Sequence, residues 1–272
     1  MIYQPEDRAI YDDLVRSFRN YGERARSISE LIMGVGKYFL GFPYVSHTLE
    51  REGRETLVIN LREFDCFTFV ENVVVLAGLI SKGKSHFMSY AAQLKKIRYR
   101  RGISKGYSSR LHYFSDWLYD NEKKGIVIDV TRRAGGEPFR EYFNFMTRHR
   151  EDYPALSMEK SYRDMMAIEK RLSGRLLHHI PKAALGKLGD AVENGDLIAI
   201  ITGIEGLDVI HVGLAVRLRK GIHLLHASEV EKKVVISDVT LHQYLSRRKT
   251  MTGIMVGRAI PAYQNGGNPS SA

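Results

Sequence analysis

The stretch Phe64-Asp65-Cys66-Phe67-Thr68-Phe69-Val70-Glu71 contains the only cysteine of the chain. Asp65 is a favourable N-cap residue, because its carboxylate can accept hydrogen bonds from backbone N–H groups of a first helical turn. The pattern predicts a helix that begins after Asp65, runs to about Ile80 and carries Cys66 in its first turn. The N–H groups and dipole of a helix start favour an anion, so we expect a lowered thiol pKa. The alternative is a buried structural cysteine, the usual role of a single free cysteine.

Helices are predicted before this segment and strands well after it. Apolar residues recur at helical spacing over residues 7–18 and 28–38. Helices first and a sheet last is the order of an α+β fold, and short connections favour an antiparallel sheet. The predicted strands are short apolar segments separated by Gly, Asp, Lys and Arg, at residues 196–202, 209–216, 221–226, 233–237 and 251–260.

The middle of the chain, about residues 84–180, is mixed and rich in aromatic and basic residues. We interpret it as an insertion or lid of helices and loops within one catalytic domain that spans residues 1–263. Residues 264–272 are polar and are predicted to form a flexible tail.

The composition is that of a soluble globular protein, with 44% hydrophobic and 26% charged residues among 272. No apolar run approaches the roughly 20 residues that span a bilayer, so we expect no integral membrane segment. The first residues contain no apolar secretory core. We therefore expect the cell envelope or periplasm if a signal peptide has been removed, and the cytoplasm otherwise. One cysteine excludes an internal disulfide and a thiolate zinc cage.

The net charge of +10 has two interpretations. Basic residues cluster at 95–101, where tyrosine is interleaved with Lys and Arg, and at 247–249. Such a patch can bind nucleic acid. However, no helix-turn-helix, zinc-finger or RNP pattern accompanies it, so we expect no nucleic-acid partner. A solvated helix face near an anionic polymer such as a cell wall suits the charge equally well.

Two histidines lie on predicted strands. His211 shares a strand face with the small residues Gly213 and Ala215, which we expect to leave room for a substrate. His226 ends the next strand, and a short turn would place it beside His211. It could then bond the far nitrogen of His211 and fix the tautomer whose near nitrogen accepts a thiol proton. Ser228 is on the same face as His226 and is predicted to line the cleft.

A zinc site made of His211, His223 and His226 is the competing interpretation. Strand parity places His223 on the face opposite His226, and no short-spaced helical pair of ligands is present. We therefore expect neither a metal nor any other cofactor. A cysteine, a base and a base-orienting group are instead the minimum parts of a cysteine hydrolase.

Together these residues resemble the NlpC/P60 superfamily of papain-like cysteine peptidases and amidases. The matching segments are Asp65-Cys66-Phe67-Thr68-Phe69-Val70, Asn194-Gly195-Asp196-Leu197, His211-Val212-Gly213-Leu214 and His226-Ala227-Ser228. The resemblance implies a papain-like fold in which the nucleophile helix packs on the C-terminal antiparallel sheet. It also implies Cys66 as nucleophile, His211 as base and His226 as orienter, with Tyr44 lining the site.

More narrowly, the chain looks like the DUF1460 group, described as N-acetylmuramoyl-L-alanine amidase-like, over about residues 10–260. The supporting segments are Gly41-Phe42-Pro43-Tyr44, Asn60-Leu61-Arg62-Glu63-Phe64-Asp65-Cys66, Glu71-Asn72, Ser109-Arg110-Leu111-His112-Tyr113-Phe114-Ser115-Asp116-Trp117 and Leu225-His226-Ala227-Ser228. This resemblance implies a cysteine-dependent cell-wall hydrolase that cleaves the bond between N-acetylmuramic acid and L-alanine in peptidoglycan fragments.

Asp65, Arg110, His112 and Trp117 are predicted substrate contacts, offering hydrogen bonds and a stacking face; ordinary loop structure is the alternative for the last three. Two other functions remain open. One is an endopeptidase acting within the stem peptide, such as at γ-D-glutamyl-diaminopimelate, and the other is a non-catalytic module that binds muropeptides.

Overall fold

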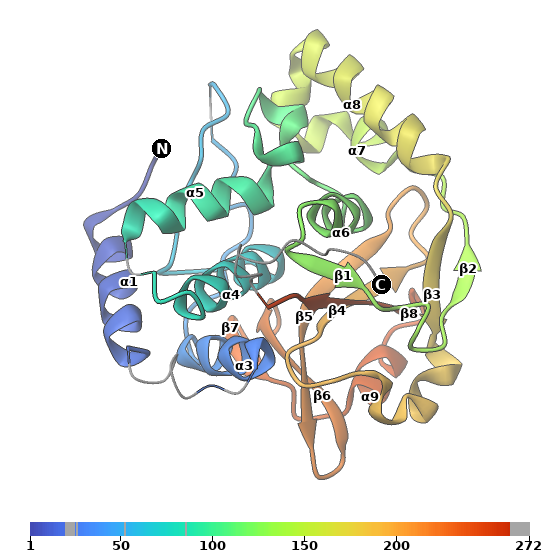
Figure 1. Ribbon diagram of the computed structural model, residues 1–272. Coiled ribbons are helices and arrows are strands. Elements are labelled where there is room, and N and C mark those ends of the chain that lie inside the picture. Colours follow the sequence, from blue (N-terminus) through green and yellow to red (C-terminus); the bar gives the residue numbers. More distant parts are fainter. Residues whose placement is uncertain (20–24, 26, 52, 85, 262–272) are drawn as a thin grey trace, which may run out of the picture.

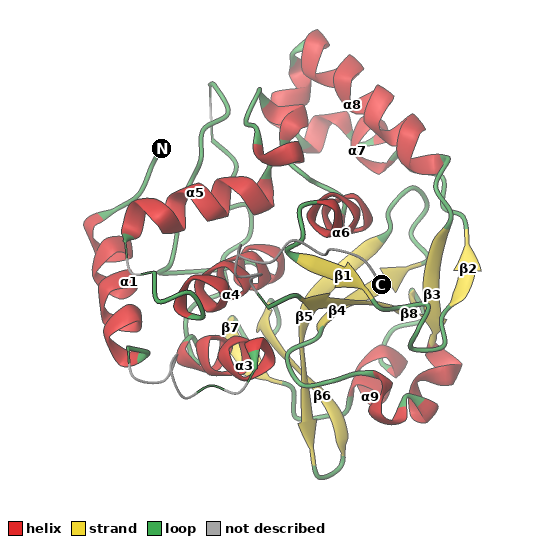
Figure 2. Cartoon of the chain, in the orientation of Figure 1, coloured by secondary structure: helices red, strands yellow, loops and turns green. Residues whose placement is uncertain are grey.

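The structure is a computed structural model that describes residues 1–19, 25, 27–51, 53–84 and 86–261 (Figure 1). Its helices are α1 (Pro5–Ser17), α3 (Ile28–Tyr38), α4 (Cys66–Ile80), α5 (Phe87–Arg98), α6 (Phe114–Lys123), α7 (Phe145–Arg148), α8 (Glu159–Ser173) and α9 (Leu241–Ser246). Its strands are β1 (Val127–Asp129), β2 (Glu137–Phe139), β3 (Leu177–Pro181), β4 (Leu197–Thr202), β5 (Val209–Leu218), β6 (Gly221–Ser228), β7 (Lys233–Ile236) and β8 (Met251–Ala259). Figure 2 shows the helices arranged around the sheet.

Within the described residues, eight strands form one sheet in the order β2-β3-β8-β4-β5-β6-β7, and β1 pairs with β8 off this path. All pairings between these strands are antiparallel. The central strand β4 reads Leu-Ile-Ala-Ile-Ile-Thr and is buried along its whole length, as a strand covered on both faces should be. The predicted α+β class and C-terminal antiparallel sheet are therefore confirmed.

Helix α4 lies at the centre of the molecule. It begins at Cys66 and ends at Ile80, as the sequence predicted. Its residues are apolar almost all round, which is the composition of a buried helix. It packs against α3, α5 and strands β5 and β6 (Figure 1). This packing places the start of α4 against the strands that carry the two predicted histidines.

Both faces of the sheet are covered by apolar side chains. On one face, Leu214 of β5 packs in the cluster that includes Val70 and Val73 of α4. On the other face, Leu224 of β6 packs with Leu245 of α9. Polar groups on β5 and β6 are therefore enclosed, which lowers the local dielectric and strengthens their interactions.

The middle region differs from the prediction of an inserted lid. Helices α5 and α6 contribute Leu94 and Trp117 to the main apolar cluster, and β1 and β3 pair with β8. The part around α7 and α8 packs in a separate cluster, which includes Phe143 and Met165. The strands here are three to five residues long, too short for an alternating pattern to stand out in the sequence.

The loop before α4 is fastened to the edge of the sheet. The N–H of Gly41 donates to the carbonyl of Val234 in β7, and the N–H of Tyr44 donates to the carbonyl of Lys232, both at 2.9 Å. An isolated parallel bridge joins Tyr44 to Phe64. These contacts hold Tyr44 close to the start of α4.

No helix of the described residues is long and apolar enough to cross a membrane. The predicted tail at residues 264–272 lies outside the described residues.

Candidate active site

Asp65 caps the helix that carries the thiol. Its Oδ1 accepts the backbone N–H of Thr68 at 2.7 Å, and the Thr68 hydroxyl accepts the N–H of Asp65 at 3.0 Å. The carbonyl of Asp65 accepts the N–H of Phe69. The two remaining N–H groups of the first turn belong to Cys66 and Phe67, and both favour a negative charge on the sulfur. This helix start can therefore stabilise an anion at the thiol or next to it.

The two histidines are side by side, as the strand pairing predicts. Nε2 of His211 lies 2.6 Å from Nδ1 of His226, and the two rings are perpendicular, with centroids 4.8 Å apart. One of these nitrogens must donate and the other accept. If Nε2 of His211 donates, then its Nδ1 carries a free lone pair and can accept a proton.

The thiol lies near the backbone of β5, and a side chain of α9 contacts both histidines. The backbone N–H of Val212, next to His211, favours the thiolate of Cys66. Tyr244 of α9 stacks on His211 at 6.1 Å between centroids and contacts His226 edge-on at 5.5 Å. Burial raises the pKa of Tyr244, and a charge on Cys66 acts in the same direction. The sequence offered no signal for Tyr244, because α9 is distant in the chain from both the thiol and β5.

The pKa of Cys66 differs from the prediction. Burial, followed by the nearby Asp65 carboxylate, raises the pKa of the thiol to about 12, and these effects outweigh the backbone N–H groups. Burial lowers the pKa of His211 to about 3 and that of His226 to about 4. The resting site therefore contains a neutral thiol and neutral imidazoles. A lowered thiol pKa, expected from the helix start alone, is wrong for this state.

The thiol forms no hydrogen bond with His211 within the part of the chain that the structure describes. Catalytic hydrogen bonds are often long before substrate binds and tighten in the complex. Proton transfer from the thiol to His211 would therefore accompany substrate binding rather than precede it.

A pocket of about 330 Å³ opens at the thiol, and we call it the Cys66 pocket. Four of the six predicted substrate contacts line it: Tyr44, Asp65, Arg110 and His112. The other lining residues are Ser46, His47, Leu49, Glu50, Cys66, Phe67, Glu71, Arg98 and Leu111. The loop 46–50 was missed because it has no regular pattern.

Arg110 and His112 are held by other groups of the wall. Arg110 donates from Nη2 to Glu50 at 2.5 Å and from Nη1 to the Leu49 carbonyl at 3.2 Å, so it fixes the loop that forms one side of the pocket. Nε2 of His112 donates to the carbonyl of Tyr107 at 3.0 Å. Burial, followed by the charge of Arg110, holds the pKa of His112 well below its usual range. His112 is thus a neutral group at neutral pH.

Trp117 does not reach the pocket. It is fully buried, its ring packs on Phe67, and its Nε1 donates to Glu71 at 3.1 Å. Glu71 also pairs with the buried Arg98 at 2.7 Å. The prediction that Trp117 stacks on the substrate is therefore wrong, because its ring is not accessible. Its indole supports the pocket floor by orienting Glu71.

The side chains of Ser228 and His223 both form hydrogen bonds with backbone groups of the protein. The Ser228 hydroxyl accepts the N–H of Glu231 at 3.1 Å and closes the turn between β6 and β7, so the prediction that it lines the cleft is not supported by its contacts. His223 bonds the carbonyl of Ser237 through Nδ1 at 2.8 Å. It lies on the strand face opposite His226, so these histidines do not converge on one ion.

The space beside Gly213 is filled by protein. A Cβ atom at this position would lie 2.9 Å from Cβ of His226 and 2.8 Å from the side chain of Leu224. The expected substrate space on this face of β5 is therefore absent. The small residue is needed instead because Cβ of His226 and the side chain of Leu224 lie close to the backbone of β5.

Gly213→Ala is expected to displace His226 and lower both activity and stability. Overpacking of a filled core costs about 1–3 kcal/mol, and the shift breaks the 2.6 Å contact between the imidazoles. Thermal unfolding and hydrolysis rates measure the two effects. Gly203→Ala is the matched control, because its Cβ would meet nothing closer than 3.6 Å. Equal behaviour of the two variants would contradict this account.

The folded protein is expected to lose stability as the pH falls from about 6.5 toward 4. His211 and His226 remain neutral when folded, with pKa values of about 3 and 4, whereas in the unfolded chain they take up protons near 6.5. The unfolded state thus binds more protons across this interval, so acid favours unfolding. The free energy of unfolding, measured in urea at pH 7.5, 5.5 and 4.5, should fall less with acid for the variant His211→Gln/His226→Gln than for the wild type.

The α+β fold thus places a thiol at a helix start near the strand that carries one member of an imidazole pair. The sequence model of the AmiA-like family, which is described as N-acetylmuramoyl-L-alanine amidase-like, matches residues 34–254. The chain belongs to this N-acetylmuramoyl-L-alanine amidase-like family.

Several solved structures share this fold. An N-acetylmuramoyl-L-alanine amidase from Bacteroides uniformis is 39% identical, with a TM-score of 0.81, and the match covers 86% of this chain and 99% of that one. A putative xylanase from Bacteroides fragilis is also 39% identical, with a TM-score of 0.79 and coverage of 83% and 99%. A Legionella pneumophila protein of the DUF1460 family, 23% identical, shares the fold, with a TM-score of 0.69 and coverage of 94% and 97%. No curated protein sequence matches significantly.

Proposed function

We propose that this protein is a cysteine amidase that cleaves the bond between N-acetylmuramic acid and L-alanine in peptidoglycan fragments. The family and the amidase from Bacteroides uniformis support the substrate. The observation that supports the mechanism is the 2.6 Å contact between His211 Nε2 and His226 Nδ1, on the strand whose Val212 N–H faces the Cys66 sulfur.

The first half-reaction forms a thioester. Nδ1 of His211 takes the proton of the Cys66 thiol as the sulfur attacks the lactyl carbonyl carbon. The N–H groups of Cys66 and Phe67 stabilise the oxyanion of the tetrahedral intermediate. His211 then returns the proton to the nitrogen of L-alanine, the carbon–nitrogen bond breaks, and the peptide leaves.

The second half-reaction uses the same base. His211 takes a proton from water, the resulting hydroxide attacks the thioester carbonyl, and the carbon–sulfur bond breaks. The proton passes to the sulfur and restores the thiol. In both halves the imidazolium of His211 donates from Nε2 to His226, a charge-assisted bond that stabilises it. Because burial lowers the pKa of His211, this partner is needed to make proton uptake favourable.

Glycoside hydrolysis is the reaction suggested by the name of the Bacteroides fragilis relative. It usually requires two carboxyl groups that flank the glycosidic bond. Three carboxylates line the Cys66 pocket, and each is bound to protein. Asp65 caps α4, Glu71 pairs with Arg98, and Glu50 pairs with Arg110. We therefore favour the thiol mechanism.

Product analysis by mass spectrometry tests the bond that is cleaved. A muropeptide with a tetrapeptide stem should yield the free sugar and a peptide that begins with L-alanine. Products cut inside the stem would instead identify an endopeptidase. Saturable binding of the muropeptide without any cleavage would identify a binding module.

A further inference from the structure

A second pocket, of about 480 Å³, lies between α6, the turn after α5 and the end of α8. We call it the basic pocket. It is lined by Arg100, Arg101, Asp116, Tyr119, Asp120, Lys123, Lys124, Arg171 and Arg175. Six cations face two carboxylates, which leaves an excess of four positive charges. None of these residues lines the Cys66 pocket.

Ion pairs to a buried carboxylate hold the inner wall of the basic pocket. The carboxylate of Asp116, which is 1% exposed, accepts from Arg100 at 2.5 Å and from Arg175 at 2.9 Å. The side chains of both arginines are less than one-fifth exposed. One carboxylate between two guanidinium groups leaves one positive charge partly buried. Such a charge is unfavourable unless an anion neutralises it.

Asp120 holds the second side of the basic pocket. It pairs with Lys124 at 2.5 Å and accepts the backbone N–H of Arg101 at 3.0 Å. Arg101 has φ of 54°, a left-handed conformation that is uncommon for a residue with a side chain. The turn is thus fixed by a carboxylate in a conformation that brings a further guanidinium to the pocket.

Two exposed cations complete the pocket. Arg171 and Lys123 form no ion pair within the residues that the structure describes. Partial desolvation of this exposed side chain, followed by the charge of Arg100, lowers the pKa of Arg171. Arg175 and Lys123 both lie over the ring of Tyr119, at 3.9 and 4.6 Å from its centroid. Both cations belong to the excess positive charge of the pocket, which a multivalent anion would reduce.

We propose that the basic pocket binds a compact diphosphate group. Guanidinium forks match the oxygens of phosphate, and two arginines are already oriented by Asp116. One phosphate monoester carries about −1.5 to −2 at neutral pH, so a single phosphate offsets at most half of the excess of four charges and a diphosphate offsets more of it. The inference does not depend on the amidase reaction.

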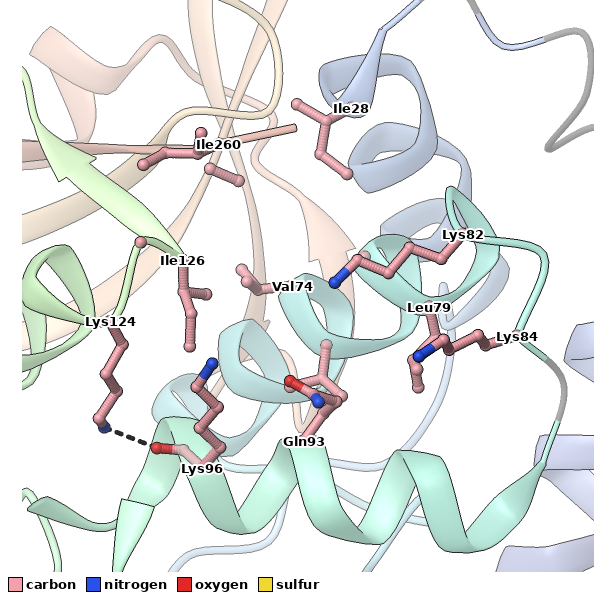
Figure 3. Close-up of a pocket in the computed structure, with 14 residues that line it drawn as sticks. Ile28, Val74, Leu79, Lys82, Lys84, Gln93, Lys96, Lys124, Ile126 and Ile260 are labelled. Atoms are coloured by element: carbon pink, nitrogen blue, oxygen red, sulfur yellow. Dashed lines mark hydrogen bonds between the residues drawn. The ribbon is translucent and has the colours of Figure 1, made fainter. Parts of the chain in front are cut away.

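The neighbouring pocket in Figure 3 has no arginines oriented by a carboxylate among its lining residues. Its volume is about 100 Å³, and its cations are Lys82, Lys84, Lys96 and Lys124. Nζ of Lys124, which the two pockets share, donates to the carbonyl of Lys96 at 2.6 Å. Arginine and an oriented carboxylate are both missing among its lining residues, so the diphosphate site is assigned to the basic pocket alone.

Titration calorimetry of the full chain with pyrophosphate tests the proposal. We expect one site per chain, with affinity at least 10-fold higher for pyrophosphate than for inorganic phosphate. The double variant Lys123→Ala/Arg171→Ala should bind pyrophosphate at least 10-fold more weakly, since both residues are exposed and their loss does not disturb the buried Asp116 pairs. Arg219→Ala/Lys220→Ala is the control. It removes the same charge from the exposed turn between β5 and β6.

Unchanged binding by the control would support a defined site. Equal weakening in both double variants would mean that net charge alone attracts the anion, and would overturn the proposal. Absence of saturable binding to the wild type, or equal affinity for phosphate and pyrophosphate, would overturn it as well. Muropeptide hydrolysis by both variants should match the wild type, which separates this result from any failure of the proposed amidase activity.

Discussion

Cys66→Ala is expected to lower the rate of muropeptide hydrolysis on the order of 10⁴-fold or more, because it removes the atom that forms the thioester. Substrate binding should be almost unchanged, since the pocket wall contributed by Asp65, Arg110 and His112 remains. Released peptide, quantified by mass spectrometry, measures the rate. Binding is measured by calorimetry with the intact muropeptide.

The fold of this variant should be preserved. Cys66 is partly exposed, and its removal leaves the cap between Asp65 and Thr68 intact. Cys66→Ser provides a second test, because a hydroxyl of similar size is a poorer nucleophile beside a neutral imidazole. Hydrolysis that persists in Cys66→Ala at near the wild-type rate would disprove the thiol mechanism. Iodoacetamide should inactivate the wild type only slowly, because a thiol with a pKa of about 12 contains little of the reactive thiolate.

His211→Ala is expected to reduce the rate by a similar factor, on the order of 10⁴-fold, since the thiol pKa of about 12 leaves almost no thiolate without a base. Residues that act as a unit show strongly non-additive losses. The double variant Cys66→Ala/His211→Ala should therefore be little worse than either single variant. The measurement is single-turnover release of the peptide across pH 5 to 9.

His242→Ala is the matched control for this second prediction, because His242 is an exposed histidine of α9 two residues from Tyr244. It should retain the wild-type rate. His226→Gln should lose less activity than His211→Ala, since a glutamine oxygen can still accept from Nε2 of His211. Additive losses in the double variant, or full activity of His211→Ala, would contradict the assignment of His211 as base.

Much of the fold was predictable because its elements are locally encoded. Asp65 marks the start of α4 through its capping carboxylate. The strands of the C-terminal sheet appear as apolar runs between breakers, and their parity predicts that His211 lies beside His226, as the structure shows. The short strands β1 and β3 could not be predicted, because their pairing with β8 is set by distant residues.

The contents of the site depended on packing. Trp117 and Arg110 belong to one continuous segment of the sequence, yet Trp117 is enclosed under α4 whereas Arg110 lines the pocket. Tyr244 arrives from a helix near the end of the chain. Nothing in local spacing distinguishes such cases, because each depends on which elements cover which face.

By itself the sequence determined the order of helices and strands, the helix start at Cys66 and the adjacency of the histidines, since capping and strand alternation are local properties of the chain. Only the tertiary structure decided the ionisation of the thiol and the walls of its pocket. The reason is that desolvation and like-charge effects depend on every element packed around a group. For Cys66 they outweighed the favourable helix start that the sequence displays.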